Sequence, residues 1–199
     1  IAASFPAQQG KVSWSSPSNI ALVKYWGKYG NQLPQNPSLS FTLTNCATTT
    51  HLSFKPKEKN DQFSFSFLFE GEEQPSFHPK MQAFFERIKT FCPYLLEHDL
   101  TISSSNSFPH SSGIASSASS MSALALSLLS IEEQGAGFTS QEHFNQKASF
   151  LARLGSGSAA RSIQGPMMSW GETKAIQGSS QKFATCINQE IHPVFRNYQ

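Results

Sequence analysis

The sequence lacks both a long apolar run and an N-terminal targeting pattern. Its mean hydropathy is −0.32, and none of its apolar stretches approaches the roughly 20 residues that a helix needs to cross a bilayer. Residues 1–10 contain neither the basic start nor the apolar core that a secretory signal requires. We therefore expect a soluble protein with no membrane partner.

Cysteine and net charge are also scarce. Cys46, Cys92 and Cys186 are odd in number, widely spaced and without a CxxC pair, which fits a reducing compartment better than a disulfide framework or a zinc site. The net charge of +2 is too small for a nucleic-acid footprint, and the basic residues are scattered along the chain. These features predict a cytoplasmic protein that binds no nucleic acid, although a local cationic pocket stays open.

The chain contains enough apolar sequence for one core. Its 199 residues and 38% hydrophobic content predict a single domain. Apolar alternation and short apolar runs predict strands at 12–14, 39–43, 63–69, 100–102 and 167–170, and a last short strand after residue 183. Apolar residues at helical spacing predict helices at 80–96, 115–130 and 141–154. The fold class is therefore α+β.

Serine gathers in two dense clusters, and the first of them contains a candidate phosphate site. In segment 109–118, small residues and hydroxyls stand where a loop enters a helix, so free backbone N–H groups and the helix dipole could hold a phosphate. The segment lacks the GxxxxGK[ST] pattern of a P-loop, and Gly-Ser loops also serve as plain helix N-caps. These residues alone leave both interpretations open.

Two further segments combine cations with polar side chains. In 18–28, Lys24 and Lys28 flank two aromatics and Gly27, a pattern that suits a diphosphate or an ordinary edge strand with exposed lysines. In 155–162, two hydroxyls and flexible glycines accompany Arg161, whose planar fork can bind a carboxylate or phosphate bidentately. A helix C-cap with a surface arginine is the alternative for that segment.

The three segments resemble motifs of one enzyme family. Segment 109–118 is similar to the phosphate loop of the GHMP kinase superfamily, with Ile114 in place of the usual Leu. Asn-Ile-Ala and Lys-Tyr-Trp-Gly-Lys in 19–28, the Leu-Pro-x-Asn-x-Ser-x-Ser-x-Thr-Leu stretch at 33–43, and Gly-Ser-Gly-Ser-Ala-x-Arg-Ser at 155–162 resemble mevalonate diphosphate decarboxylases. The motifs follow the family's order from residue 17 to residue 171.

The resemblance implies a fold and a reaction. The fold is a GHMP-kinase N-terminal domain similar to ribosomal protein S5 domain 2, with 1–199 as one domain truncated before a C-terminal domain. The implied reaction is the ATP- and Mg²⁺-dependent decarboxylation of (R)-5-diphosphomevalonate to isopentenyl diphosphate in isoprenoid biosynthesis, by an enzyme that is commonly a homodimer when complete. The family's aspartate in an Asp-x-Gly-Pro-Asn-type segment is absent from these residues, so we expect this chain alone to be inactive.

Alternatives on the same scaffold are a mevalonate 3-kinase, a phosphomevalonate decarboxylase and a non-catalytic binding module.

The resemblance also assigns site residues. The ATP-binding residues are Ser111, Ser112, Gly113, Ile114, Ala115, Ser116 and Ser117, of which Ser117 would also contact magnesium. The substrate-binding residues are Asn19, Tyr25, Trp26, Gly27, Lys28, Lys80, Ser156, Gly157, Ser158 and Arg161, with Lys80 in place of a family arginine that touches the diphosphate. Lys24, Ser117 and Arg161 are the expected catalytic residues, and the six histidines, His110 included, receive no catalytic role.

Overall fold

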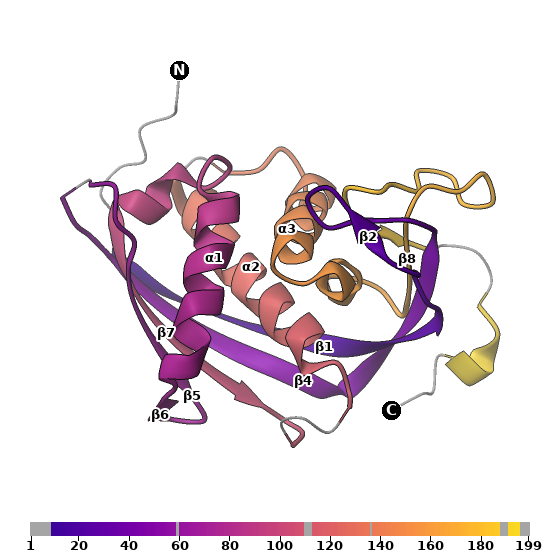
Figure 1. The fold of residues 1–199 in the computed structure, drawn as a ribbon, viewed down its shortest axis with the longest axis horizontal. Coiled ribbons are helices and arrows are strands. Elements are labelled where there is room, and N and C mark those ends of the chain that lie inside the picture. The colour runs from indigo at the N-terminus through magenta and orange to yellow at the C-terminus, as the bar shows by residue number, and fades with distance from the viewer. Residues whose placement is uncertain (1–8, 59, 110–112, 136, 188–190, 196–199) are drawn as a thin grey trace.

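The computed structural model describes residues 9–58, 60–109, 113–135, 137–187 and 191–195. Two long antiparallel strands, β1 (Gly10–Val23) and β4 (Ser38–Pro56), form the spine of a twisted sheet (Figure 1). Along β4, the second half pairs with β7 (His98–Asn106) and the first half pairs with β8 (Met167–Trp170). Because β4 pairs with both strands, the sheet is continuous from β7, under the helices, to β8 at the other end of the molecule (Figure 1).

Shorter strands complete the sheet. β5 (Ser64–Phe69) runs parallel to β7 and turns into β6 (Glu72–Glu73), while β9 (Thr185–Cys186) extends the sheet beyond β8. A separate two-stranded hairpin is formed by β2 (Lys28–Tyr29) and β3 (Leu33–Pro34). This hairpin follows β1 after residues 24–27 and begins with Lys28. Lys28 is the second lysine of segment 18–28, which we call the lysine-aromatic motif.

Three helices cover one face of the sheet (Figure 1). They are α1 (His78–Ile88), α2 (Ser116–Gly135) and α3 (Gln141–Gly155). The short 3₁₀ turns are η1 (Pro75–Phe77) before α1, η2 (Pro93–Leu96) before β7, η3 (Gly157–Ser162) after α3 and η4 (Pro193–Phe195) after β9. The apolar side chains of the helices meet the sheet in one core, which includes Phe84, Phe85, Ile102, Leu128 and Leu151. Burial of this surface supplies the main drive to fold. No helix in the described ranges is both long and apolar enough to cross a membrane.

The serines of α2 explain part of the first serine cluster. Ser122 and Ser127 are fully buried, and their hydroxyls donate to the carbonyls of Ala118 and Ala123 in the preceding turn, each at 2.8 Å. A hydroxyl that bonds back to its own helix removes the cost of burying a polar group. These serines therefore let α2 pass through the core, whereas Ser116 and Ser117 stand at its exposed start.

The predicted α+β class is confirmed, and the helix at 141–154 and the strand at 167–170 lie where the pattern placed them. The predicted helix at 80–96 is wrong after Ile88, because Pro93 cannot continue a helix and forces Cys92 out of the helical region. The strand predicted at 39–43 extends to residue 56. The last strand is only two residues long.

Candidate functional site

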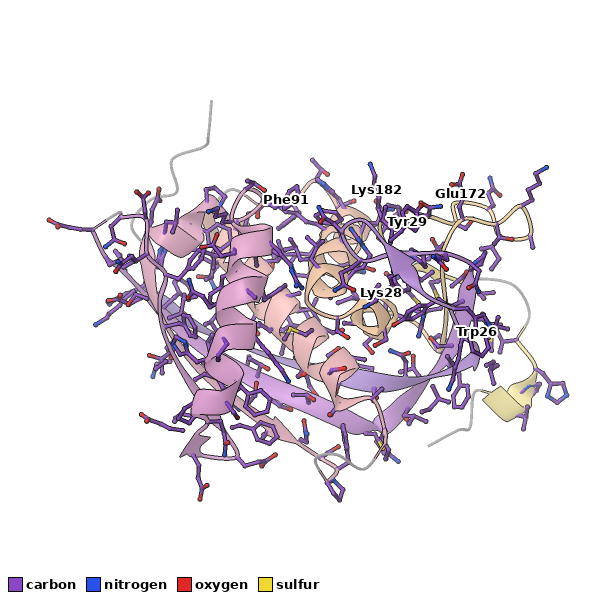
Figure 2. All side chains as sticks on the ribbon, in the orientation of Figure 1. Trp26, Lys28, Tyr29, Phe91, Glu172 and Lys182 are labelled. Atoms are coloured by element: carbon purple, nitrogen blue, oxygen red, sulfur yellow. The ribbon has the colours of Figure 1, made fainter. Side chains whose placement is uncertain are left out.

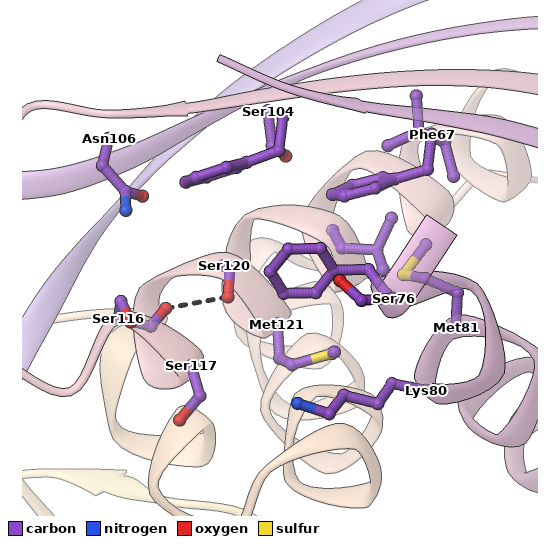
Figure 3. A pocket seen from close by; sticks show the side chains of 14 residues that line it. Phe67, Ser76, Lys80, Met81, Ser104, Asn106, Ser116, Ser117, Ser120 and Met121 are labelled. Carbon is purple, nitrogen blue, oxygen red and sulfur yellow. Dashed lines mark hydrogen bonds between the residues drawn. The ribbon is translucent and has the colours of Figure 1, made fainter. Parts of the chain in front are cut away.

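A cavity of about 360 Å³ opens where α1, β5, β7 and the start of α2 meet (Figure 3). Aromatic and thioether side chains form its apolar walls, notably Phe67, Phe69, Phe77 and Met121. Its polar lining consists of Lys80, Ser76, Ser104, Asn106, Ser116, Ser117 and Ser120. An apolar slot with a few convergent polar groups is the usual form of a small-molecule site.

The start of α2 forms one end of this cavity. Gly113 and Ala115 both have positive φ, at 81° and 46°, so the chain turns sharply just before the helix. Ser18 on β1, which is fully buried, donates a hydrogen bond to the carbonyl of Ile114 and thereby fixes the turn. The first turn of any helix leaves backbone N–H groups without partners inside the helix, and these attract anions. Of the predicted phosphate loop, Ser111 and Ser112 lie outside the described residues, as does His110.

Lys80 lies on the wall of the same cavity. It stands in the first turn of α1, with its ammonium 5.8 Å from the centre of the Phe77 ring, and Figure 3 shows its side chain directed toward Met121 and Ser117. The structure therefore groups Lys80 with the residues expected to bind ATP. Its assignment to the substrate diphosphate stays a prediction.

A series of hydroxyls leads out of the cavity along η3. The Oγ atoms of Ser117 and Ser156 are 3.4 Å apart, and those of Ser156 and Ser158 are also 3.4 Å apart. Ser156 follows the end of α3, so the start of α2 and the end of α3 meet at this point. Three residues that the motifs singled out separately are thus brought together.

Arg161 occupies a buried pocket beyond these hydroxyls. Only 2% of the residue is exposed, so the alternative of a surface arginine is excluded. Its guanidinium donates to Ser40 Oγ at 3.0 Å, to Ser38 Oγ at 2.6 Å and to Asn19 Oδ1 at 3.3 Å. The rings of Tyr25 and Trp170 lie 5.7 and 5.9 Å from it, which suits cation–π attraction.

The positive charge of Arg161 is not neutralised by the described part of the chain. There, the ion pairs are formed by Lys55, Lys89 and Lys147. Burial lowers the pKa of Arg161 to about 10, against a smaller opposing effect of Tyr25. Because a guanidinium has five N–H groups and three are used, two remain for an anion.

Asn19 is held in place as a partner of this arginine. It is 3% exposed, and its Nδ2 donates to the carbonyl of Ser158 at 3.1 Å and to Ser162 Oγ at 2.7 Å. With its amide group fixed in this way, Oδ1 faces the guanidinium of Arg161. Asn19, Ser158 and Arg161 therefore form one polar network with strand β1 on one side and η3 on the other.

The lysine-aromatic motif lies beside that network. Lys24 and Trp26 are exposed, Trp26 to 78%, and Figure 2 shows Trp26 and Lys28 at the β2–β8 end of the molecule. Tyr25 packs edge-on against Trp170, with ring centres 4.9 Å apart. The Lys28 ammonium donates to Gln32 Oε1.

Gly157 and Gly27 allow the close approaches around this motif. A Cβ atom on Gly157 would stand 2.9 Å from a ring carbon of Trp170 and 3.3 Å from Cδ of Lys28. Gly27 has a φ of 109°, a value that favours glycine. The structure thus brings Lys28 close to η3, and the substrate-binding assignment of these residues stays a prediction.

Several polar residues of the site received no role from the sequence. Ser38 and Ser40, the acceptors of Arg161, belong to the 33–43 stretch that resembled the family but carried no assignment. The Asn36 side chain, from the same stretch, bonds to the backbone of Trp26 and Lys24. Both belong to the loop of residues 24–27 between β1 and β2, which we call the lysine loop. The sequence did contain a signal that Asn36, Ser38 and Ser40 act together. They stand at every second position, and residues at that spacing share one face of a strand.

The fold and the site together define an α+β domain with two adjacent pockets, one apolar-walled and one centred on a buried arginine. Residues 16–182 match the family described as the diphosphomevalonate decarboxylase-like N-terminal domain. The chain belongs to this family.

Relatives agree with this assignment. The chain is similar to a diphosphomevalonate decarboxylase of Bos taurus, at 33% identity over 80% of this chain and 40% of the relative. A crystal structure of mevalonate diphosphate decarboxylase from Staphylococcus aureus superposes with a TM-score of 0.70, at 29% identity over 91% of this chain and 51% of the other.

A solved complex of MDDEF with MVAPP, AMPPCP and magnesium gives a TM-score of 0.67, at 32% identity over 90% of this chain and 50% of the other. The chain thus spans about half the length of these relatives.

Proposed function

We propose that this chain forms the ATP- and substrate-binding half of a diphosphomevalonate decarboxylase. The observation that carries the proposal is the buried guanidinium of Arg161, which has two free N–H groups and no acidic partner in the described part of the chain. A substrate carboxylate would supply the missing charge and accept both N–H groups. Ser117, Ser156 and Ser158 connect this pocket to the cavity that would hold ATP.

The cavity has the chemistry that a nucleotide needs. Its aromatic walls fit a base, and the start of α2 with Lys80 fits phosphate groups. Within the described ranges, no group of three or more His, Cys, Asp or Glu side chains is placed to hold a metal ion. Magnesium often binds chiefly through substrate phosphates and water, so the Ser117 hydroxyl is the protein ligand that we assign to it.

The substrate would bind across η3 and the lysine loop. Arg161 and Asn19 would hold the carboxylate end, while Lys24 and Lys28 would neutralise the diphosphate from the exposed side. Tyr25 would contribute the ring that lies beside the guanidinium. Holding both charged ends fixes the 3-hydroxyl between them, which is the positioning that phosphoryl transfer requires.

The proposed reaction converts (R)-5-diphosphomevalonate to isopentenyl diphosphate. ATP would supply a phosphoryl group to the 3-hydroxyl, which makes that oxygen a good leaving group. The bond between the carboxylate carbon and C2 then breaks as phosphate leaves C3, and its electron pair forms the new double bond. The products are isopentenyl diphosphate, ADP, phosphate and carbon dioxide.

The 199-residue chain alone should show no turnover. Its only aspartates are Asp61 and Asp99, and Asp99 pairs with Lys55 at 3.8 Å at the far end of β4. Neither aspartate lines the cavity or contacts Arg161. A base for the 3-hydroxyl would therefore have to come from elsewhere in the complete protein.

We also propose a cytosolic location and a homodimer for the complete protein. All three cysteines, Cys46, Cys92 and Cys186, are free thiols, as a reducing compartment favours.

The test is product analysis. The complete gene product would be incubated with Mg-ATP and diphosphomevalonate while carbon dioxide, ADP and the organic product are followed in parallel. Equal amounts of carbon dioxide and ADP with isopentenyl diphosphate would support the proposal. ADP without carbon dioxide would replace it with a 3-kinase, a preference for the monophosphate would indicate a phosphomevalonate decarboxylase, and no reaction would indicate a binding module.

A further inference from the structure

The loop between β1 and β2 is held by a single amide side chain. Asn36 Oδ1 accepts a hydrogen bond from the backbone N–H of Trp26 at 2.6 Å. Its Nδ2 donates to the carbonyl of Lys24 at 3.0 Å and to the carbonyl of Pro37 at 2.8 Å. One side chain therefore holds the backbone of Lys24 and of Trp26, which lies between the two lysines.

Apart from Tyr25, which packs against Trp170, the lysine loop is mostly exposed. Residues 24–27 belong to no strand, and three of them, Lys24, Trp26 and Gly27, are exposed. The Gly27 carbonyl accepts a backbone bond from Gln35 at 3.1 Å, which adds one tie to the same hairpin. The Asn36 side chain thus supplies hydrogen bonds to the backbone of this loop, as the neighbouring strand β4 does for β1.

Asn36 also links the lysine loop to the arginine pocket. The residue before a proline is confined to extended conformations, so Pro37 restricts the backbone from which the Asn36 amide projects. Two residues later, Ser38 accepts from Arg161 Nη1 at 2.6 Å. The Lys24 backbone and the Arg161 guanidinium are therefore both bonded to one stretch of three consecutive residues, from Asn36 to Ser38.

We infer that Asn36 is a positioning residue for the diphosphate end of the substrate. The inference rests on the proposed function, because it presumes that Lys24 and Lys28 bind the diphosphate. A lysine side chain is long and flexible, so the place of its ammonium depends on where the backbone is held. Asn36 itself need not touch the substrate.

Two variants separate the roles of the amide. Asn36→Ala removes all three bonds, whereas the isosteric Asn36→Asp keeps the acceptor for the Trp26 N–H and loses both donors. Gln35→Ala is the matched control, since the neighbouring residue ties Gly27 through its backbone. The readouts in the 199-residue chain are hydrogen exchange of the Trp26 amide, the urea midpoint, and the Kd for inorganic pyrophosphate.

We expect Asn36→Ala to speed exchange of the Trp26 amide about tenfold, as loss of one hydrogen bond implies, and Asn36→Asp to leave it protected. Both variants should raise the pyrophosphate Kd about tenfold, which is more than any accompanying fall in the urea midpoint accounts for. In the complete gene product, both should raise KM for diphosphomevalonate with little change in kcat, which is the sign of lost ground-state binding. Gln35→Ala should match the wild type throughout.

The outcomes separate this inference from the proposed function. If the wild-type chain binds pyrophosphate and both Asn36 variants bind it equally well, the positioning role is wrong and the proposed function stands. If the wild-type chain does not bind pyrophosphate and the complete gene product does not turn over diphosphomevalonate, both are overturned. A lowered urea midpoint that accounts for the loss of binding would reduce Asn36 to a structural residue and also overturn the inference.

Discussion

The replacement Arg161→Met should remove recognition of the substrate carboxylate and also lower the stability of the fold. In the free protein, lowering the pKa of this guanidinium to about 10 corresponds to a burial cost of about 3 kcal/mol for its charge. Methionine removes that cost but also removes three hydrogen bonds of the charged guanidinium, to Ser38, Ser40 and Asn19, worth about 1.5–3 kcal/mol each. The lost bonds outweigh the relieved burial cost, so the free energy of unfolding should fall by about 2–6 kcal/mol.

Recognition of the carboxylate is measured separately from stability, as a preference between two ligands. Two charge-assisted bonds from Arg161 to a carboxylate are worth about 1.5–3 kcal/mol each, which corresponds to about 10²- to 10⁴-fold in Kd. The assay is calorimetric titration of the complete gene product with diphosphomevalonate and with isopentenyl diphosphate, which lacks the carboxylate. The wild type should prefer the carboxylate-bearing ligand by that factor, and Arg161→Met should show almost no preference.

Arg153 supplies the control. It is also 2% exposed, and burial likewise lowers its pKa to about 10. Its guanidinium donates to backbone carbonyls, those of Lys182 and Asn31, so Arg153→Met should keep the preference between the two ligands. An Arg161→Met variant that retained the wild-type preference within about threefold would refute the assignment of the carboxylate to this pocket.

Three further predictions follow from packing and burial. Gly157→Ala should weaken diphosphomevalonate binding about tenfold in titrations, because the added methyl meets Trp170 and Lys28; unchanged affinity would contradict the tight contact. Burial raises the pKa of Cys92 to about 12, so stability should be full below pH 9 and fall by about 1.4 kcal/mol per pH unit as pH rises toward 12, less steeply in Cys92→Ala. Urea unfolding of Phe85→Ala should show a loss of about 3–5 kcal/mol, since that ring is fully buried, and a loss below 1 kcal/mol would be inconsistent with its place in the core.

The local patterns of the sequence predicted the elements that depend on neighbouring residues. The helix at 141–154 was predicted from its apolar spacing, and the structure adds an N-cap at Ser140, whose hydroxyl accepts from the His143 N–H at 3.1 Å. In the structure, Ser117 meets Ser156 and Tyr25 lies beside Arg161, while the roles that the family resemblance assigned to these residues stay predictions.

The long strand β4 shows why the rest could not be predicted. Its second half turns Thr48 and Thr50 inward, where apolar side chains would have given a clear alternation. Those hydroxyls are satisfied by Ser119 and Ser104, each at 2.7 Å, on α2 and β7. Partners so distant in sequence leave no local signal.

The burial of Arg161 could not be predicted from the sequence for the same reason. Its burial depends on Tyr25 and Trp170, which come from opposite ends of the chain. Its hydrogen bonds reach Ser38 and Ser40, more than 100 residues earlier. Sequence spacing identified the arginine as a candidate anion ligand, but only the tertiary structure distinguishes a buried, unneutralised cation from a surface residue.

The most direct test of the two-pocket arrangement is to map where each ligand binds on the 199-residue chain. Backbone amide spectra would be recorded during separate titrations with AMPPCP and with diphosphomevalonate at millimolar concentrations. AMPPCP should shift the signals of the cavity, such as those of Ser104, Asn106 and Met121, and diphosphomevalonate should shift those of Asn19 and Arg161. Ligands that shifted the same residues, or that shifted neither set, would contradict two adjacent pockets.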